Sequence, residues 1–401
     1  MIKLLFWPVL VPSFLFAAAL GAITPLIILA AIDIGISPAA AALLMAASGV
    51  AALACTVPVG AAIDRVGDKR AMTLATLNAA GALALTILAL AVPSGWSIAL
   101  YIAGHLLRVP AQVAWGLARQ AVVAETVAAK DRGKAMTSLG GAQRAGFLAG
   151  PLVGSLMLIW LPLWTVFAFS IVLVLAATVL LRIPRFNSTF DRATAQAREN
   201  RAATETSQLS VTWNTVFVAG IGVSLLSVAR VSQPILVALW GLHLGWSEAQ
   251  ISLAIALGSA LEMVLMFPGG YLKDRVGRSF ILSLCLVFFG GGFLLVPFWG
   301  GSWGFIFALV CMSVGNGLGS GINMTIGADL SPDTGRAKFL SIWSMFSQVA
   351  VVGGPLGISA VLTASALPAT FILVGSLTVF GAAWALATQP ITKLPTGSRR
   401  S

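Results

Sequence analysis

Charged residues are scarce in this chain of 401 residues. They make up 9% of the sequence, whereas an ordinary soluble domain carries about 25%. Hydrophobic residues make up 58%, and the mean hydropathy is +0.97. A soluble fold could not hide this much apolar surface, because most of a globular surface must face water. The scarcity of charge therefore excludes a cytosolic enzyme, a nucleic-acid-binding protein and a disordered chain.

Histidine and cysteine are also rare, with two and three copies. Cys55, Cys285 and Cys311 all lie in apolar runs, which is typical of small buried side chains. Their spacing fits neither a disulfide framework nor a metal site. The motifs of serine hydrolases, zinc proteases and ATP-binding loops are missing as well. We therefore expect no enzymatic activity, no metal and no cofactor.

Long apolar runs fill most of the chain. A helix needs about 20 apolar residues to span a bilayer, and lipid admits only helices or closed barrels. Runs this long and without alternation are helical. The sequence predicts an all-α integral membrane fold of twelve transmembrane helices in two pseudo-symmetric six-helix bundles. The predicted spans are 5–32, 38–63, 71–93, 96–124, 134–160 and 163–183, then 213–243, 248–272, 279–298, 303–328, 337–363 and 367–388.

The predicted domains follow from these spans: an N-terminal bundle over 1–183, a hydrophilic linker over 184–212, a C-terminal bundle over 213–390 and a tail over 391–401. Lysine and arginine outside the spans occur only in alternate loops, which include the linker and the tail. By the positive-inside rule, we expect a multi-pass protein of the cell membrane with linker, tail and both termini in the cytoplasm.

The two halves repeat. Residues 60–67 return as residues 270–277, and Gly35 and Ser37 return as Gly245 and Ser247, all at an offset of 210. Two further segments also recur, namely 131–135 as 333–337 and 150–151 as 354–355. A duplicated six-helix unit is typical of transporters in which the halves rock about a midplane site.

On these motifs the chain resembles the major facilitator superfamily over its whole length. The family signature between helices two and three is matched by Gly60, Asp64, Arg65, Gly67 and Arg70. The fifth-helix motif of twelve-helix drug:proton antiporters is similar to Gly146, Gly150, Pro151 and Gly154. The fourth helix departs from the family, because the usual arginine position falls near His105 while Arg108 stands one turn on.

This resemblance implies a cytoplasmic latch that closes when the transporter faces outward. Its residues would be those of the first signature together with their second copy, Asp274 and Arg275. The alternative is that the basic residues of this cluster only keep the loop on the cytoplasmic side, as the positive-inside rule describes. The resemblance of the fifth helix favours export, and simple packing of small residues is the alternative there.

Polar residues inside the spans are costly in lipid and therefore indicate a functional site. His105, Arg108, Gln112 and Arg119 share one face of the fourth helix, which we expect to line a cavity. A packed histidine is the alternative for His105, and a side chain that reaches the interface is the alternative for Arg119. The other candidate cavity residues are Gln143, Arg144, Arg230, Gln233, Asn316, Asn323 and Gln348.

Glu262 is the one carboxylate predicted near the middle of the bilayer. Burial favours the neutral form of a carboxyl group, so Glu262 is the candidate for proton coupling. A static ion pair with Arg230 or Arg108 is the alternative. Three arginines against one carboxylate make the expected cavity positive, which favours an acidic or amphipathic substrate.

These observations predict a secondary active transporter that moves a small organic molecule by alternating access, with proton-coupled export favoured. The alternative is an importer or uniporter of an organic anion or a siderophore-like compound. The expected partners are the substrate, the proton and the lipid bilayer, with no nucleic acid, and the expected functional form is a monomer.

Overall fold

The computed structural model describes residues 5–92, 94–126, 132–183, 211–332 and 336–395. Every regular element in these ranges is a helix. The predicted linker falls largely outside the described residues, as do residue 131 and residues 333–335 of the repeated segments. The helices divide between two compact units. Unit 1 comprises Met1–Ser37, Ala47–Thr204 and Ser247–Ala256, and unit 2 comprises Pro38–Ala46, Glu205–Trp246 and Leu257–Ser401.

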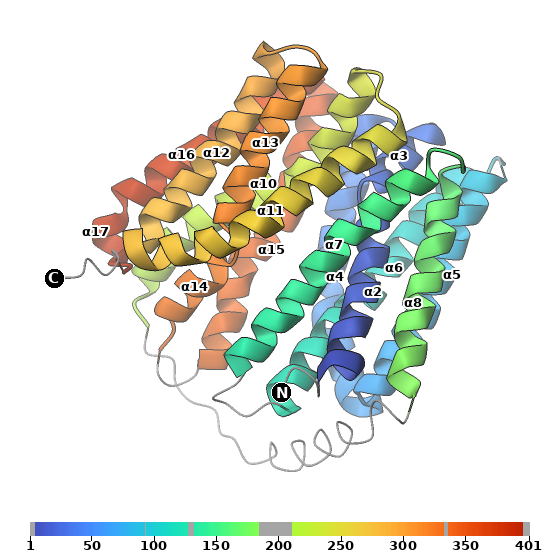
Figure 1. Cartoon of the computed structure of the whole chain (residues 1–401), viewed down its shortest axis with the longest axis horizontal. Helices are drawn as coiled ribbons and strands as arrows, with labels where there is room; N and C mark the ends of the chain where they lie inside the picture. Colours follow the sequence, from blue (N-terminus) through green and yellow to red (C-terminus); the bar gives the residue numbers. More distant parts are fainter. Residues whose placement is uncertain (1–4, 93, 127–131, 184–210, 333–335, 396–401) are drawn as a thin grey trace. The chain divides into compact units, whose positions relative to one another are not determined.

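The first six spans provide most of unit 1 (Figure 1). In it, α2 lies against α7 and α8, and α5 lies against α6 and α8. A stack of Phe16 on the fully buried Trp115 lies in the core of this unit, with ring centroids 4.5 Å apart. The elements are η1 (Phe6–Leu10), α2 (Val11–Ile23), α3 (Leu26–Asp33), α4 (Pro38–Val66), α5 (Asp68–Ala91), α6 (Ser97–Thr126), α7 (Arg132–Met157) and α8 (Trp164–Arg182).

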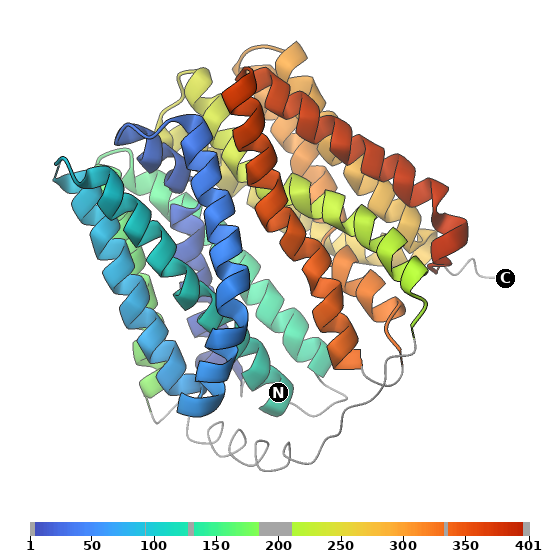
Figure 2. The same ribbon diagram turned by 180° about the vertical axis from the view of Figure 1, so that it is seen from behind.

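The last six spans provide most of unit 2 (Figure 2). Here α12 lies against α13 and α16, and α10 lies against α15 and α16. The buried rings of Phe289, Phe293 and Phe371 contribute to its core. The elements are α10 (Trp213–His243), α11 (Glu248–Val276), α12 (Arg278–Phe298), α13 (Ser302–Leu318), α14 (Ile322–Asp329), α15 (Arg336–Ala364), α16 (Leu367–Ala387) and α17 (Gln389–Thr392).

The described residues contain ten stretches that are long and apolar enough to span a membrane. Helices α6 and α7, with 30 and 26 residues, have the length of a span but carry polar side chains such as Arg108 and Arg144. Together these helices supply the twelve predicted spans, because η1, α2 and α3 form one of them and α13 and α14 form another. The predicted fold class, two six-helix halves of an all-α membrane protein, is confirmed.

The sequence repeat is also a repeat of backbone geometry. Gly35 and Gly245 both adopt positive φ, at 90° and 75°, after α3 and α10. The amides that follow repeat the same bonds, because Ile36 N–H donates to Ala31 and Trp246 N–H donates to Gly241 at the offset of 210. Gly67 and Gly277 precede α5 and α12 with φ of 86° and 108°. The copied residues therefore mark copied helix ends.

Candidate functional site

The polar face of α6 lies in unit 1 and begins with His105 and Arg108. Arg108 Nη2 lies 3.5 Å from His105 Nδ1, and His105 is only 4% exposed. Because a guanidinium only donates hydrogen bonds, Nδ1 accepts here and the second ring nitrogen carries the hydrogen. That nitrogen, Nε2, has no hydrogen-bond partner among the described residues. Arg108 is half-buried and Gln112 is exposed.

Arg119, further along the same helix, is held inside unit 1. Its side chain is 4% exposed, and Nη2 donates to the Pro12 carbonyl at 2.7 Å. The guanidinium lies over the Trp115 ring, 4.3 Å from its centroid, in a cation–π contact. Aromatic stacking and a backbone carbonyl therefore hold the charge inside unit 1, which favours the packed position over a side chain that extends to the interface.

The glycines of the fifth-helix motif pack α7 onto α2. A Cβ atom at Gly146 would lie 2.5 Å from the Phe14 carbonyl oxygen, and one at Gly150 would lie 2.5 Å from the Ala22 nitrogen. At Gly154 the nearest atom would be 3.4 Å away, which is an ordinary contact. Gly146 and Gly150 therefore allow a close approach of two backbones within unit 1. Gln143 and Arg144, one turn earlier on α7, are half-buried.

The first turns of α11 are bonded to the same helix within unit 1. Ser252 Oγ donates to the Pro151 carbonyl at 3.0 Å, and Ser155 Oγ donates to the Ala249 carbonyl at 2.9 Å. These two reciprocal bonds explain why Ser247–Ala256 groups with unit 1. The motif around Pro151 therefore contacts two helices, α2 through its glycines and α11 through its carbonyl.

In unit 2, Arg230 of α10 meets residues of the tenth span. Its Nε donates to Asn316 Oδ1 at 2.7 Å, and its Nη2 donates to the Gly319 carbonyl at 2.9 Å. Gly319 lies between α13 and α14, where the span is interrupted. The structure thus brings together two predicted site residues, Arg230 and Asn316, and adds a backbone acceptor that the sequence did not indicate.

A second polar cluster of unit 2 surrounds Asn323 on α14. Its Nδ2 donates to Ser347 Oγ at 2.7 Å, and its Oδ1 accepts from Trp343 Nε1 at 2.7 Å. Ser227 Oγ donates to Ser347 Oγ at 3.3 Å. Helices α14 and α15 therefore meet at this amide, and α10 joins the cluster through Ser347. Gln233 and Gln348, the remaining predicted residues on α10 and α15, are half-buried.

Glu262 is the fifteenth of the 29 residues of α11 and is half-buried. A Cβ atom at Gly317 would lie 3.0 Å from both Glu262 Cα and the Glu262 carbonyl oxygen. The backbone at Glu262 therefore packs directly against α13. Among the described acidic residues, Glu262 is the one far from both ends of its helix.

The residues of the predicted latch lie at helix ends. In unit 1, Asp64, Arg65 and Arg70 are exposed, and no atom of the described residues lies within 4 Å of a Cβ atom built on Gly60. In unit 2, the guanidinium of Arg275 lies 4.7 Å from the ring centroid of Tyr271. The side chain of Asp274 falls outside the described part of the chain.

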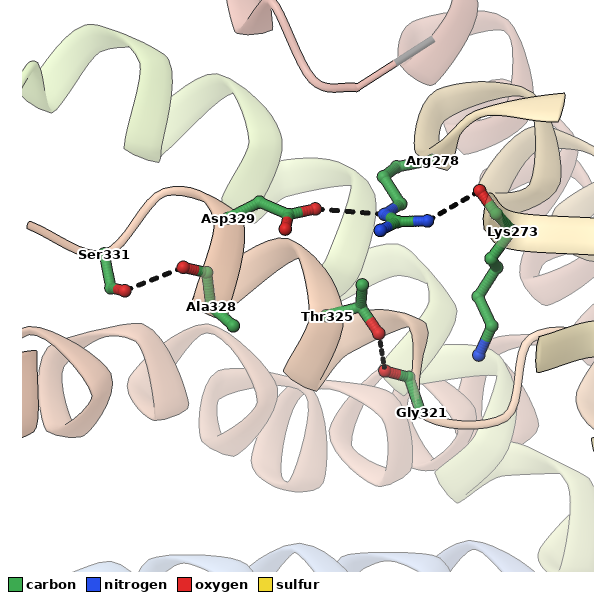
Figure 3. Close-up of polar contacts among 7 residues, drawn as sticks. All are labelled: Lys273, Arg278, Gly321, Thr325, Ala328, Asp329 and Ser331. Atoms are coloured by element: carbon green, nitrogen blue, oxygen red, sulfur yellow. Dashed lines mark hydrogen bonds and ion pairs between the residues drawn. The ribbon is translucent and has the colours of Figure 1, made fainter. Parts of the chain in front are cut away.

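Sequence reasoning missed a charged cluster beside the second copy of this motif (Figure 3). Arg278 Nε pairs with Asp329 Oδ2 at 3.0 Å, and Arg278 Nη1 donates to the Lys273 carbonyl at 2.6 Å. The ammonium group of Lys273 donates to the Ser320 carbonyl. One signal was present in the sequence, because Lys273 stands where the first copy has Ile63.

Comparison with known proteins agrees with this architecture. The sequence profile of the Major Facilitator Superfamily matches residues 9–231 and 212–401. An "Uncharacterized transporter" from Buchnera aphidicola subsp. Schizaphis graminum (strain Sg) is 31% identical over 122 residues. That match spans 29% of this chain and 31% of the relative's length.

Solved structures share the fold at low identity. A peptide transporter, POT, in complex with sulfate is 14% identical, with a TM-score of 0.75 over 98% of this chain and 96% of its own. A D-xylose-proton symporter is 14% identical, with a TM-score of 0.71 over 94% and 96%. The human organic anion transporter MFSD10 (TETRAN) is 15% identical, with a TM-score of 0.65 over 96% and 99%.

Proposed function

The chain belongs to the Major Facilitator Superfamily, and from this premise we propose that it is a proton-coupled exporter of a small organic molecule. Membership makes it a secondary transporter, not an enzyme. The coupling to protons, the direction and the substrate are the parts that we propose. The observation that carries the proton coupling is the place of Glu262 in the middle of α11, packed against α13.

A carboxyl group in the middle of a span is costly in lipid, so its presence there indicates a functional role. Removal from water favours its protonated form, while access to water on one side favours release of the proton. In an exporter, Glu262 would take up a proton from the outer side as substrate leaves there, and would release that proton to the cytoplasm once the site faces inward and binds new substrate. Alternating access links the two events, because the central site opens to only one side at a time.

Export is proposed from the resemblance of Gly146, Gly150, Pro151 and Gly154 to the motif of drug:proton antiporters. The same segment packs against α2 and accepts from Ser252, so it holds the part of α7 that lies next to Arg144 and Gln143. The cytoplasmic latch is proposed on Asp64, Arg65, Gly67, Arg70, Asp274 and Arg275, with Gly60 at its start.

Import or uniport of an organic anion is the second candidate. It is supported by the positive residues Arg108, Arg144 and Arg230 in the spans, which suit an acidic or amphipathic substrate. Two proteins with the same fold are described as a D-xylose-proton symporter and an organic anion transporter. These likenesses keep symport and anion transport as alternatives to antiport.

The test begins with a thermal-stabilisation screen of the purified protein against organic anions, antibiotics and siderophores. Compounds that stabilise it are then added to proteoliposomes that contain a pH-sensitive dye. Antiport moves protons in the direction opposite to the substrate, symport moves them in the same direction, and uniport moves none. We expect Glu262→Gln to keep substrate exchange and to lose proton movement, whereas Glu248→Gln, at the first residue of the same helix, keeps both. Full proton coupling in Glu262→Gln would refute the proposed role.

A further inference from the structure

The tenth span is interrupted between α13, which ends at Leu318, and α14, which begins at Ile322. Gly321 adopts the left-handed conformation, with φ 74° and ψ 1°, which a residue without a side chain adopts at no steric cost. An interruption releases backbone carbonyls from the helical pattern. In a membrane-spanning segment such carbonyls need donors from elsewhere in the protein, because lipid supplies none.

Two cations of unit 2 supply donors to consecutive carbonyls of the interruption. Arg230 Nη2 binds the Gly319 carbonyl at 2.9 Å, which also accepts from the Ile322 N–H at 3.1 Å, and the Lys273 ammonium binds the Ser320 carbonyl. Lys273 is 7% exposed, which is unusual for lysine. Interrupted transporter helices offer such carbonyls to bound cations. Here the cations are side chains of the protein itself.

The comparison of the two halves connects the cations with the interruption. At the offset of 210, Arg230 corresponds to Leu20 and Lys273 corresponds to Ile63. The fourth span of the first half, α6, is one continuous helix of 30 residues. The half whose fourth span is interrupted therefore has both cations, and the half whose fourth span is continuous has apolar residues at both positions.

Further contacts hold the short helix α14 once it is separated from α13. At its C-terminal end Asp329 pairs with Arg278, which also binds the Lys273 carbonyl (Figure 3). Near its start, Asn323 is bonded to Trp343 and Ser347. The last residue of α14 is thus tied to α12 and its second residue to α15, while the interruption just before it is tied to α11. Its orientation depends on these ties, since no continuous helix fixes it.

We propose that Arg230 and Lys273 are positioning residues. Their charged side chains bind backbone carbonyls at the interruption of the tenth span and thereby hold α14 in place. In this role they orient Asn316 and Asn323, the two amides on either side of the interruption. The link to substrate binding rests on the proposed transport function, whereas the hold on α14 does not. Arg230 then contributes to the substrate site through Asn316, which it contacts at 2.7 Å.

The hold on α14 is tested by hydrogen–deuterium exchange of the full-length protein in detergent micelles. Lys273→Met keeps most of the side-chain length and removes the charge. We expect exchange of the amides of residues 319–325 to rise at least about tenfold, as expected for loss of a charge-assisted hydrogen bond. Arg230→Met should act in the same direction. Lys273→Arg should restore slow exchange, because it returns a cation to the Ser320 carbonyl.

The matched control is Glu248→Gln, which removes a charge at the first residue of the same helix, at the end opposite Lys273. It should leave exchange of residues 319–325 unchanged. If Lys273→Met does not fold, Lys273→Gln compared with Lys273→Arg provides the same test, and faster exchange in the glutamine variant supports the proposal. Unchanged exchange in a folded neutral variant, with or without loss of transport, would overturn it. Failure of proton coupling in liposomes would refute only the proposed function.

Discussion

At the scale of single residues, burial and contact distinguish members of the same motif. Gly146 and Gly150 each lie where a Cβ atom would meet the backbone of α2, whereas Gly154 leaves room for one. The spacing of these residues in the sequence predicted a ridge of small residues on the fifth span. It did not show which of them the neighbouring helix reaches, because that depends on where α2 crosses α7.

Gly150→Ala is expected to destabilise the protein. The added methyl group would meet Ala22 and Ala18 of α2, and overpacking of this kind costs about 1–3 kcal/mol. The unfolding temperature of the purified protein should fall by several degrees relative to wild type. Gly154→Ala is the control, since its nearest neighbour would be Val166 Cγ1 at 3.4 Å. An equal loss in both variants would contradict this account.

At the scale of elements, both copies of the loop motif begin the following helix with the same backbone conformation. Gly67 has φ 86° and ψ 151°, and Gly277 has φ 108° and ψ 157°. This region of backbone conformation is almost restricted to glycine. The glycines of the family signature therefore turn the chain into α5 and α12, whether or not the loops also act as a latch.

Gly277→Ala is expected to strain the start of α12. A residue held in this conformation costs about 1–3 kcal/mol, so the unfolding temperature should fall. The matched control is Gly291→Ala within α12, where a Cβ atom would have no neighbour within 4 Å among the described residues. That change should be neutral or stabilising, because glycine weakens a helix interior by about 0.5–1 kcal/mol relative to alanine. If Gly277→Ala were as stable as Gly291→Ala, the helix start would not require glycine.

At the scale of the whole molecule, the distribution of lysine and arginine carries the predicted topology. Outside the spans, these residues occupy alternate loops, and the loops between them, such as 93–95, 161–163 and 300–302, have none. The positive-inside rule depends on this asymmetry and not on the fold. It predicts that the loop between α12 and α13 lies on the outer side, while the loop between α11 and α12 lies in the cytoplasm.

Reporter fusions in a bacterial host test this topology. Alkaline phosphatase is active only outside the cytoplasm, where its disulfides form. We expect a fusion after residue 401 to be inactive and a fusion after Gly300 to be active, with green fluorescent protein giving the reverse pattern. An active phosphatase at residue 401 would place the C-terminus outside and contradict the predicted orientation.

The sequence by itself determined the membrane fold, the twelve spans, the duplication and the family. Each of these depends on local properties: apolar length, loop charge, and motifs copied at an offset of 210. The tertiary structure decided which polar side chains meet. Arg230 contacts Asn316 and the Gly319 carbonyl from 86 and 89 residues away, and Lys273 contacts Ser320 from 47. Such contacts depend on how helices cross and on where a glycine-rich span is interrupted. Glycine content permits the interruption, but only packing against α10 and α11 places it.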